Sequence, residues 1–201
     1  YQIPILIAEN YRYNEETNII RQLVADDRVG NVVYFLYNRV MDFPREMWKD
    51  AFPARDWRQY PEYPGGAITA SAVHDLAAIR HIFGAIDRLQ AFGHPQDEEF
   101  SPYSAIVVNM MFSSGVVGQF SFFCAGKEAQ SPAVGFRIFG SSGMIYLESR
   151  DAGVIHIAMN DGRIEGVPFE PQKGYYKELL NLANAMAGRE PISVPPEMEY
   201  G

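Results

Sequence analysis

Proton transfer near neutral pH is a reaction that histidine performs readily, and the chain holds four histidines, His74, His81, His94 and His156. Two of them lie within residues 66–83, where apolar residues recur at helical spacing. A separation of seven residues returns a side chain to the same helix face, so His74 and His81 are expected on one side. Two interpretations stay open here: an acid–base group beside a cleft, or the polar side of an ordinary amphipathic helix.

The neighbours of His74 indicate what kind of site it could form. Ala70 and Ala77 share its expected helix face and leave room for a molecule to approach. Asp75 points about 100° away around the helix, so a capping or surface role is expected for it rather than the orientation of His74. Neither a carboxylate nor a thiol stands at the spacing that zinc requires, so no metal site is predicted.

Two further segments have the composition of a site. Residues 42–64 form a long predicted loop in which Trp57 could stack on a sugar or nicotinamide ring and Arg58 could offer a planar fork of donors. Aromatic side chains that close the edge of the core would explain the same composition equally well. Residues 9–13 interleave polar and aromatic side chains directly after an apolar run, as a site segment often does.

Charge and motifs exclude several functional classes. With 17 basic against 25 acidic residues and a net charge of -8, the chain is not expected to bind nucleic acid. The motifs G-x-S-x-G, H-E-x-x-H and Walker A are absent, so no hydrolase signature remains. The dinucleotide fingerprint G-x-G-x-x-G is absent too, and the chain alone is not expected to hold a nucleotide tightly.

Length and composition predict a globular domain. The 201 residues, 47% hydrophobic and 21% charged, suffice for one core. The lone cysteine, Cys124, cannot form an intrachain disulfide; together with the absence of a leader peptide it favours the cytoplasm. No apolar run is long enough to cross a membrane, and the opening at Tyr1 suggests a piece of a longer protein.

Hydrophobic periodicity predicts the order of elements. We expect helices at residues 15–24, 66–83 and 174–187, and strands at residues 3–8, 32–41, 86–92, 105–112, 116–124, 136–139, 144–147, 154–159 and 163–167. The last helix is expected to face inward through Tyr176, Leu179, Leu180, Ala183 and Met186. Successive hairpin turns indicate an antiparallel meander, and the order as a whole predicts an α+β fold with helices on one sheet face.

Several segments, taken in order, resemble the Gfo/Idh/MocA family, named after glucose-fructose oxidoreductase and inositol dehydrogenase. The matching segments are I-A-E-N-Y-R-Y at 7–13, R-V-G-N-V at 28–32, Trp57-Arg58, G-G-A-I at 65–68 with His74, F-G-S-S-G-M-I at 139–145 and Y-K-E-L-L at 176–180. The resemblance covers nearly the whole chain. It implies an α+β, dihydrodipicolinate reductase-like C-terminal domain with a largely antiparallel, open-faced sheet, and no Rossmann domain within this sequence.

The resemblance also implies domain boundaries and partners. Residues 1–8 would be a remnant of the last Rossmann strand, and residues 9–201 the substrate-binding and oligomerisation domain. NAD or NADP would be bound mainly by the N-terminal domain that this sequence lacks. A homo-oligomer would form through the open sheet face. Alternating residues such as Val107, Asn109 and Met111 could contribute to that face, or they could equally belong to the core.

The resemblance implies roles for individual residues. His74 falls on the catalytic histidine of the motif G-G-x-x-x-D-x-x-x-H, while Trp57 and Arg58 would lie beside the nicotinamide. Arg12 and Tyr176 are candidates for substrate binding. Ala70 replaces the aspartate that supports the family's histidine, and neither neighbouring residue lies on the same face to replace it.

Two functions follow. The first is a nicotinamide-dependent oxidoreductase of a sugar, polyol or related hydroxy compound, in which His74 moves the hydroxyl proton. In that case the isolated chain would be inactive without its N-terminal domain. The alternative is a non-catalytic member that binds a ligand or builds the oligomer, with Ala70 marking a lost proton relay.

Overall fold

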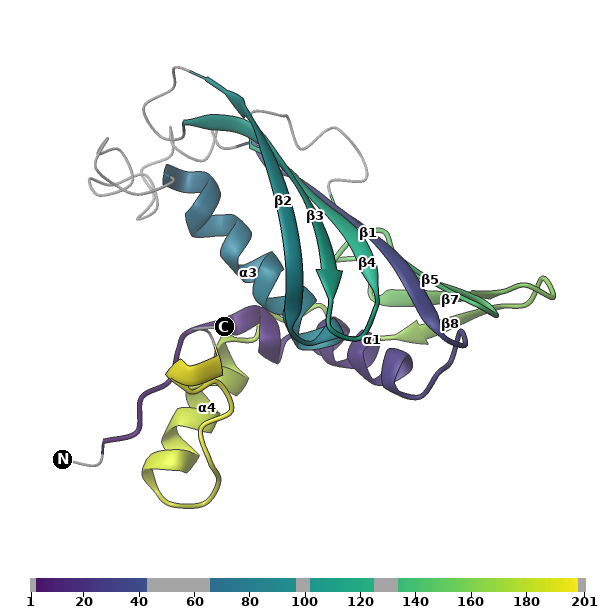
Figure 1. Cartoon of the computed structure of the whole chain (residues 1–201). Helices are drawn as coiled ribbons and strands as arrows, with labels where there is room; N and C mark the ends of the chain where they lie inside the picture. The colour runs from purple at the N-terminus through teal and green to yellow at the C-terminus, as the bar shows by residue number, and fades with distance from the viewer. Residues whose placement is uncertain (1–2, 43–65, 97–101, 125–133, 199–201) are drawn as a thin grey trace.

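The protein is an α+β domain in which helices cover one face of a single sheet (Figure 1). The computed structural model describes residues 3–42, 66–96, 102–124 and 134–198. The helices are η1 (Asn10–Tyr13), α1 (Glu15–Ala25), α3 (Gly66–Phe83), α4 (Tyr175–Met186) and η4 (Pro196–Met198). The strands are β1 (Val32–Val40), β2 (Ile86–Pro95), β3 (Tyr103–Phe112), β4 (Val117–Phe123), β5 (Val134–Gly140), β6 (Gly143–Leu147), β7 (Val154–Met159) and β8 (Ile164–Pro168).

The sheet is not the simple meander that the hairpin turns suggested. Its strand order is β2-β3-β4-β1-β5-β6-β7-β8, so the first strand in the sequence lies in the middle. Strand β1 pairs in parallel with β4 and antiparallel with β5, whereas every other neighbouring pair is antiparallel. The meander prediction was wrong at this point because hairpin signals report only on neighbours along the chain. The expected largely antiparallel character is confirmed.

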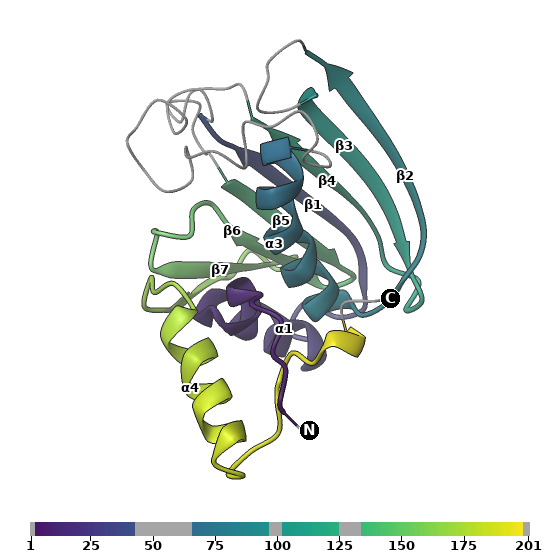
Figure 2. The same ribbon diagram turned by 90° about the vertical axis from the view of Figure 1, so that its left-hand side faces the viewer.

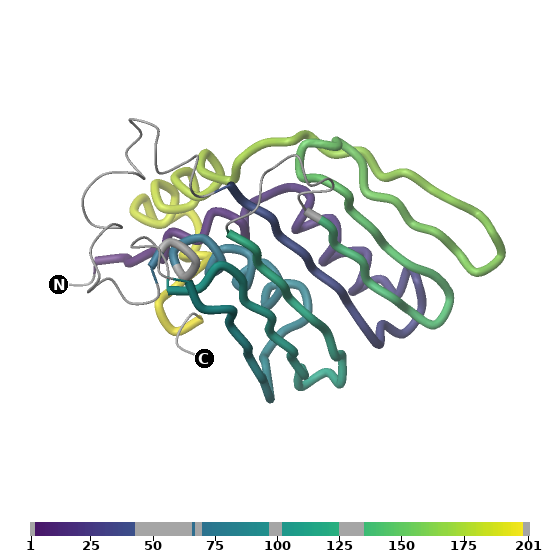
Figure 3. The backbone as a smooth tube through the Cα atoms, turned by 90° about the horizontal axis from the view of Figure 1, so that it is seen from above, coloured from purple at the N-terminus to yellow at the C-terminus, as the bar shows by residue number. Residues whose placement is uncertain are grey.

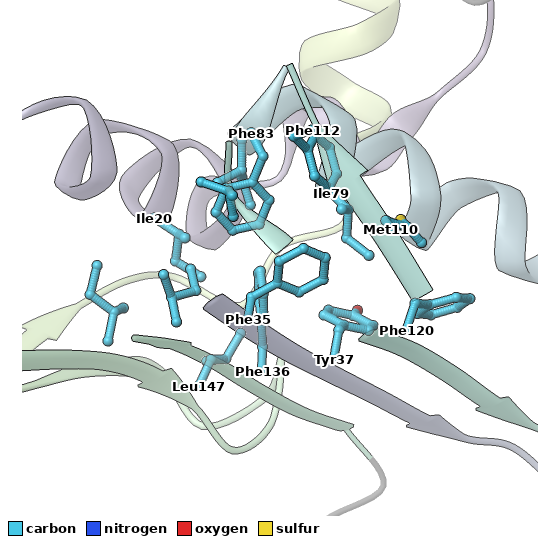
Figure 4. Close-up of a cluster of buried hydrophobic side chains, with 14 of the residues drawn as sticks. Ile20, Phe35, Tyr37, Ile79, Phe83, Met110, Phe112, Phe120, Phe136 and Leu147 are labelled. Carbon is cyan, nitrogen blue, oxygen red and sulfur yellow. The ribbon is translucent and has the colours of Figure 1, made fainter. Parts of the chain in front are cut away.

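The hydrophobic core lies between the sheet and the two helices α1 and α3 (Figure 4). Phe35 and Tyr37 alternate on β1 and point toward the helices, where Phe35 stacks on Phe83 with 4.7 Å between ring centroids. Ile20 of α1 and Ile79 of α3 close the same cluster. Because burial of each large apolar side chain is worth roughly 1.5–3 kcal/mol, this cluster fixes how α3 lies across the sheet.

The other face of the sheet carries no helix among the described residues (Figures 1 and 3). Met111 of β3 and Val117 of β4 are exposed there. Gln119 donates a hydrogen bond to Asn109 across the same two strands. The alternation of residues in β3 is compatible with an open face or with plain core, and the structure leaves Asn109 and Met111 exposed.

Helix α4 lies apart from the sheet, beside η1 (Figure 2). Its apolar residues were expected to face inward, and that prediction was wrong. Tyr176 is 74% exposed, and Leu179, Leu180 and Met186 are also exposed. The buried side of the helix is polar instead, and it consists of Glu178 and Asn181. The side-chain oxygen of Asn181 accepts hydrogen bonds from the Tyr13 hydroxyl of η1 and from the backbone N–H of Ser193.

The segment before η1 differs from expectation as well. Residues 3–8 form no strand in the structure; one backbone hydrogen bond joins the Ile7 N–H to the carbonyl of Val194. A strand needs a neighbouring strand to complete its ladder, and the described residues offer none here. No helix among the described residues is long and apolar enough to span a membrane.

Candidate functional site

His74 lies midway along α3, on the side that faces η1. Helix α3 has the bounds that its periodicity predicted, and Gly84, with φ of +90°, ends it in a conformation that few other residues adopt. The Nδ1 atom of His74 lies 2.8 Å from Oε2 of Glu9. The His74 side chain keeps 31% of its surface exposed, so the imidazole has a partner on one side and solvent access on the other.

Glu9 is a buried carboxylate held by the turn that begins η1. It is 6% exposed. Its backbone N–H donates to the carbonyl of Ile7, and its own carbonyl accepts from the N–H of Arg12. A buried carboxylate is costly without a partner, and the described partner of this side chain is the His74 imidazole.

A stack of side chains extends from His74 toward the sheet. The ring of Tyr11 lies 5.3 Å from the imidazole, centroid to centroid. The guanidinium carbon of Arg150 lies 3.6 Å from the centroid of the Tyr11 ring, which is a cation–π contact. The stack limits the rotation of Tyr11, which in turn packs against one side of His74.

Arg150 belongs to a buried polar network that joins α3 to β1. The Tyr37 hydroxyl donates to Oδ1 of Asp75 at 2.6 Å, and Nη2 of Arg150 donates to both of these oxygens at 2.8 and 2.9 Å. Burial raises the pKa of the Tyr37 hydroxyl, so it stays protonated as a donor. The expectation of a capping or surface role for Asp75 was wrong, because this side chain is 1% exposed and anchors the helix.

A second buried carboxylate, Glu178 of α4, lies near the first. Burial raises the pKa of Glu178 above its ordinary value, the negative charge of Glu9 raises it further, and His74 lowers it. Its Oε1 atom has no hydrogen-bond partner among the described residues. Glu9 therefore lies between an imidazole from α3 and a carboxyl group from α4.

A pocket of about 350 Å³ opens beside the Tyr11–Arg150 stack. Polar and charged side chains line much of it, including Arg39 at the end of β1 and Lys173 before α4. The Nε atom of Arg39 is buried and has no hydrogen-bond partner among the described residues. The pocket offers space for a small polar molecule next to the residues that hold His74.

His81, the other histidine of α3, has a different environment. Its Nε2 atom lies 3.1 Å from Oδ1 of Asn18 on α1. The amide nitrogen of Asn18 donates to the carbonyls of Arg12 and Asn14, so its oxygen is the acceptor and His81 is the donor. Burial, together with the charges of Arg12 and Arg21, lowers the pKa of His81 to about 4.

The structure brings together only part of the predicted site. Arg12 lines a different cavity, of about 570 Å³, together with His81 and Lys177. Tyr176 lies on the exposed face of α4. Trp57 and Arg58 lie outside the described residues.

Sequence reasoning missed Glu9, Arg150 and Glu178. Glu9 and Glu178 each had a signal, since Glu9 opens the mixed polar and aromatic segment 9–13 and Glu178 lies in the segment 176–180 that resembles the family. Within the described parts of the chain, no group of three histidine, cysteine or carboxylate side chains is arranged to hold a metal ion.

Comparison with protein-family models gives one match that covers most of the chain. Residues 17–146 match the model described as the GFO/IDH/MocA C-terminal domain. The match begins within α1, includes β1 and α3, and ends within β6.

Individual proteins are similar over nearly the whole chain at low identity. An uncharacterized protein of Saccharomyces cerevisiae, YMR315W, is 22% identical over an alignment of 198 residues that covers 94% of this chain and 55% of that protein. Among solved structures, an oxidoreductase from Thermotoga maritima superposes with a TM-score of 0.77 at 23% identity, covering 96% of this chain and 55% of that one. A levoglucosan dehydrogenase in complex with NADH and levoglucosan has the same TM-score at 17% identity, and the superposition covers 98% of this chain and 60% of that one. The chain thus spans little more than half the length of these proteins.

Proposed function

The chain belongs to the GFO/IDH/MocA family, and from this premise we propose that its full-length protein is a nicotinamide-dependent oxidoreductase. The substrate class is a sugar, polyol or related hydroxy compound. The observation that carries the proposal is the partly exposed imidazole of His74 on a buried carboxylate, because that arrangement suits a group that takes up and returns a proton. A structurally similar levoglucosan dehydrogenase, solved with NADH and levoglucosan, supports the substrate class.

His74 acts in this proposal as the acid–base group. During oxidation, Nε2 of His74 accepts the proton of the substrate hydroxyl while the carbon–oxygen bond becomes a carbonyl. A bound nicotinamide would supply the acceptor for the hydride that leaves the same carbon. In reduction, the imidazolium returns its proton to the oxygen. Glu9 and Tyr11 hold the ring in place for both directions.

The described residues fit the substrate half of such a site rather than the nucleotide half. They contain the His74 imidazole and a polar pocket lined by its neighbour Tyr11, while the sequence has no G-x-G-x-x-G turn to hold a pyrophosphate. We therefore propose that NAD or NADP is bound mainly by an N-terminal domain, with residues 1–8 at the junction and 9–201 as the second domain. Trp57 and Arg58 are proposed beside the nicotinamide, and Arg12 and Tyr176 as substrate contacts.

Two exposed surfaces fit this arrangement. The apolar face of α4, with Leu179, Leu180 and Met186, suits packing against the proposed N-terminal domain. The helix-free sheet face, with Met111 and Val117, suits a homo-oligomer interface. We further place the protein in the cytoplasm, on the ground that its single cysteine forms no intrachain disulfide.

Turnover by the full-length protein tests the proposal. Reduction of NAD and of NADP is measured against a panel of sugars and polyols, with His74→Ala and His81→Gln run in parallel. We expect His74→Ala to lose roughly 10²- to 10⁴-fold in kcat, while His81→Gln stays close to wild type. Binding of cofactor without turnover of any substrate would instead support the non-catalytic alternative. In that case the protein binds a ligand or builds an oligomer, and Ala70 in place of the aspartate reflects a lost proton relay.

A further inference from the structure

We propose that Glu9 is the positioning residue of His74 and takes the place of the aspartate that Ala70 replaces. This inference rests on the proposed acid–base role of His74. The resemblance to the family places the supporting carboxylate one turn earlier on the same helix, where this chain has only a methyl group. The structure supplies a carboxylate from the residue that precedes η1 instead, 65 residues away in the sequence.

The contact determines which nitrogen of His74 carries the proton. A carboxylate oxygen only accepts hydrogen bonds, so at 2.8 Å from Glu9 the Nδ1 atom must be the donor. The neutral imidazole then has a bare Nε2 atom, which is the form that can accept a proton from a hydroxyl. Free imidazole side chains favour the opposite tautomer, with the proton on Nε2, so Glu9 selects the minor form.

No other described carboxylate is placed for this role. Asp75 follows His74 in the sequence, but its oxygen accepts from Tyr37 and Arg150. Glu178 makes no hydrogen bond to the imidazole, and burial together with the negative charge of Glu9 raises its pKa above the ordinary value. A carboxylate at Glu9 also stabilises the imidazolium that forms during the reaction.

The packing around the ring limits how His74 can turn. Tyr11 lies against the imidazole and is itself covered by Arg150, which the Asp75 and Tyr37 oxygens hold in place. Because Glu9 is buried, its hydrogen bond to Nδ1 does not compete with solvent as an exposed pair would. The hydrogen bond to Glu9 therefore sets the tautomer of His74, and the Tyr11–Arg150 stack limits the position of its ring.

Nitrogen-15 NMR of the imidazoles tests the inference directly, without cofactor or substrate. In alkaline solution, two-bond nitrogen–proton correlations of the 201-residue chain should show His74 protonated on Nδ1. His81 is an internal contrast, because its contact with Asn18 requires the proton on Nε2. Signals are assigned by loss of one peak set in each of His74→Gln and His81→Gln.

Two substitutions at position 9 then challenge the contact. In Glu9→Gln, which keeps the shape, the amide can donate to Nδ1, and in Glu9→Ala no acceptor remains. Both should move the His74 proton to Nε2 and leave His81 unchanged, whereas the matched control Glu178→Gln should leave the His74 tautomer as it is. His74 protonated on Nε2 in the wild type, or retention of the Nδ1 proton in both Glu9 variants, would overturn the inference.

Kinetics separate this inference from the proposed function. If the full-length protein turns over, Glu9→Gln should lower kcat by about 10- to 100-fold with little change in KM, since a wrong tautomer impairs proton transfer but leaves binding intact. An unchanged kcat in both position-9 variants of an active enzyme would refute the positioning role. An inactive wild type with the expected tautomers would instead refute the oxidoreductase function and leave the Glu9–His74 contact established.

Discussion

His74 and His81 stand on the same helix, seven residues apart, and share a face, yet their surroundings give them opposite properties. His74 donates from Nδ1 to a buried carboxylate and keeps part of its ring exposed. His81 donates from Nε2 to a neutral amide, and burial beside two arginines lowers its pKa to about 4. The first can gain a proton that Glu9 stabilises, whereas the second is held neutral.

The difference shows that the chemistry of a helix face is decided by what packs against it. The turn of η1 supplies Glu9 to His74, and helix α1 supplies Asn18 to His81. One partner carries a charge and the other does not. The predictions below test this contrast, beginning with the largest expected effect.

Removal of each imidazole should affect turnover very differently. We expect His74→Ala to cost roughly 10²- to 10⁴-fold in kcat of the full-length enzyme, because it removes the acid–base group. His81→Ala should change kcat little, since its imidazole is bound to Asn18. Steady-state kinetics of both variants check this, and equal losses at the two positions would remove the distinction between them.

The anchor of α3 should affect stability more than any surface contact. Arg150→Ala leaves Asp75 buried without its cation, so we expect a loss of about 3–5 kcal/mol in the free energy of unfolding. Urea denaturation measures it. The matched control is Arg28→Ala, which breaks an exposed pair with Glu165 and should cost about 0–1 kcal/mol. Similar losses in the two variants would show that the buried network does not anchor the helix.

The low pKa of His81 predicts a dependence of stability on acid. Between pH 6.5 and about 4, the unfolded chain binds a proton at His81 and the folded chain does not, so stability falls as the pH decreases through this range. Because the side chain is partly exposed, we discount the effect to about 1–2 kcal/mol.

His81→Gln provides the measurement. The difference in unfolding free energy between wild type and variant, from urea denaturation at several pH values, should become less favourable to the wild type on acidification. His74→Gln serves as the comparison on the same helix. If the difference in unfolding free energy between wild type and His81→Gln stays constant between pH 7 and 4, His81 has the same pKa in the folded and the unfolded chain.

Restoring the family's aspartate should have the smallest effect. In Ala70→Asp the new carboxylate stands one turn before His74, but Glu9 already occupies Nδ1, so we expect less than about a threefold change in kcat. In a Glu9→Ala background the same substitution should recover activity. The kcat values of the wild type, the two single variants and the double variant form a double-mutant cycle. A large gain in kcat from Ala70→Asp alone would show that Glu9 does not orient the imidazole.

Much of the fold could be predicted from local pattern. Helix α3 has its expected bounds, and β7 matches residues 154–159, because periodicity and the adjacent glycines are encoded within a few residues. The insertion of β1 between β4 and β5 could not be predicted, since pairing of distant strands leaves no local signal. The apolar face of α4 was predicted to be buried, but in the structure it is exposed and the polar face is buried. Periodicity shows that a helix has an apolar side, but it does not show which neighbour covers that side.

The site divides in the same way. By itself the sequence determined that a histidine stands on a helix face with small neighbours, that the family's aspartate is replaced by Ala70, and that residues 9–13 have the composition of a site. Only the tertiary structure decided that Glu9 is the partner of His74, that Asp75 is a buried anchor, and that His81 is held neutral. The physical reason is that helical periodicity depends on neighbours in the chain, whereas a hydrogen-bond partner or a buried charge depends on segments that only folding brings together.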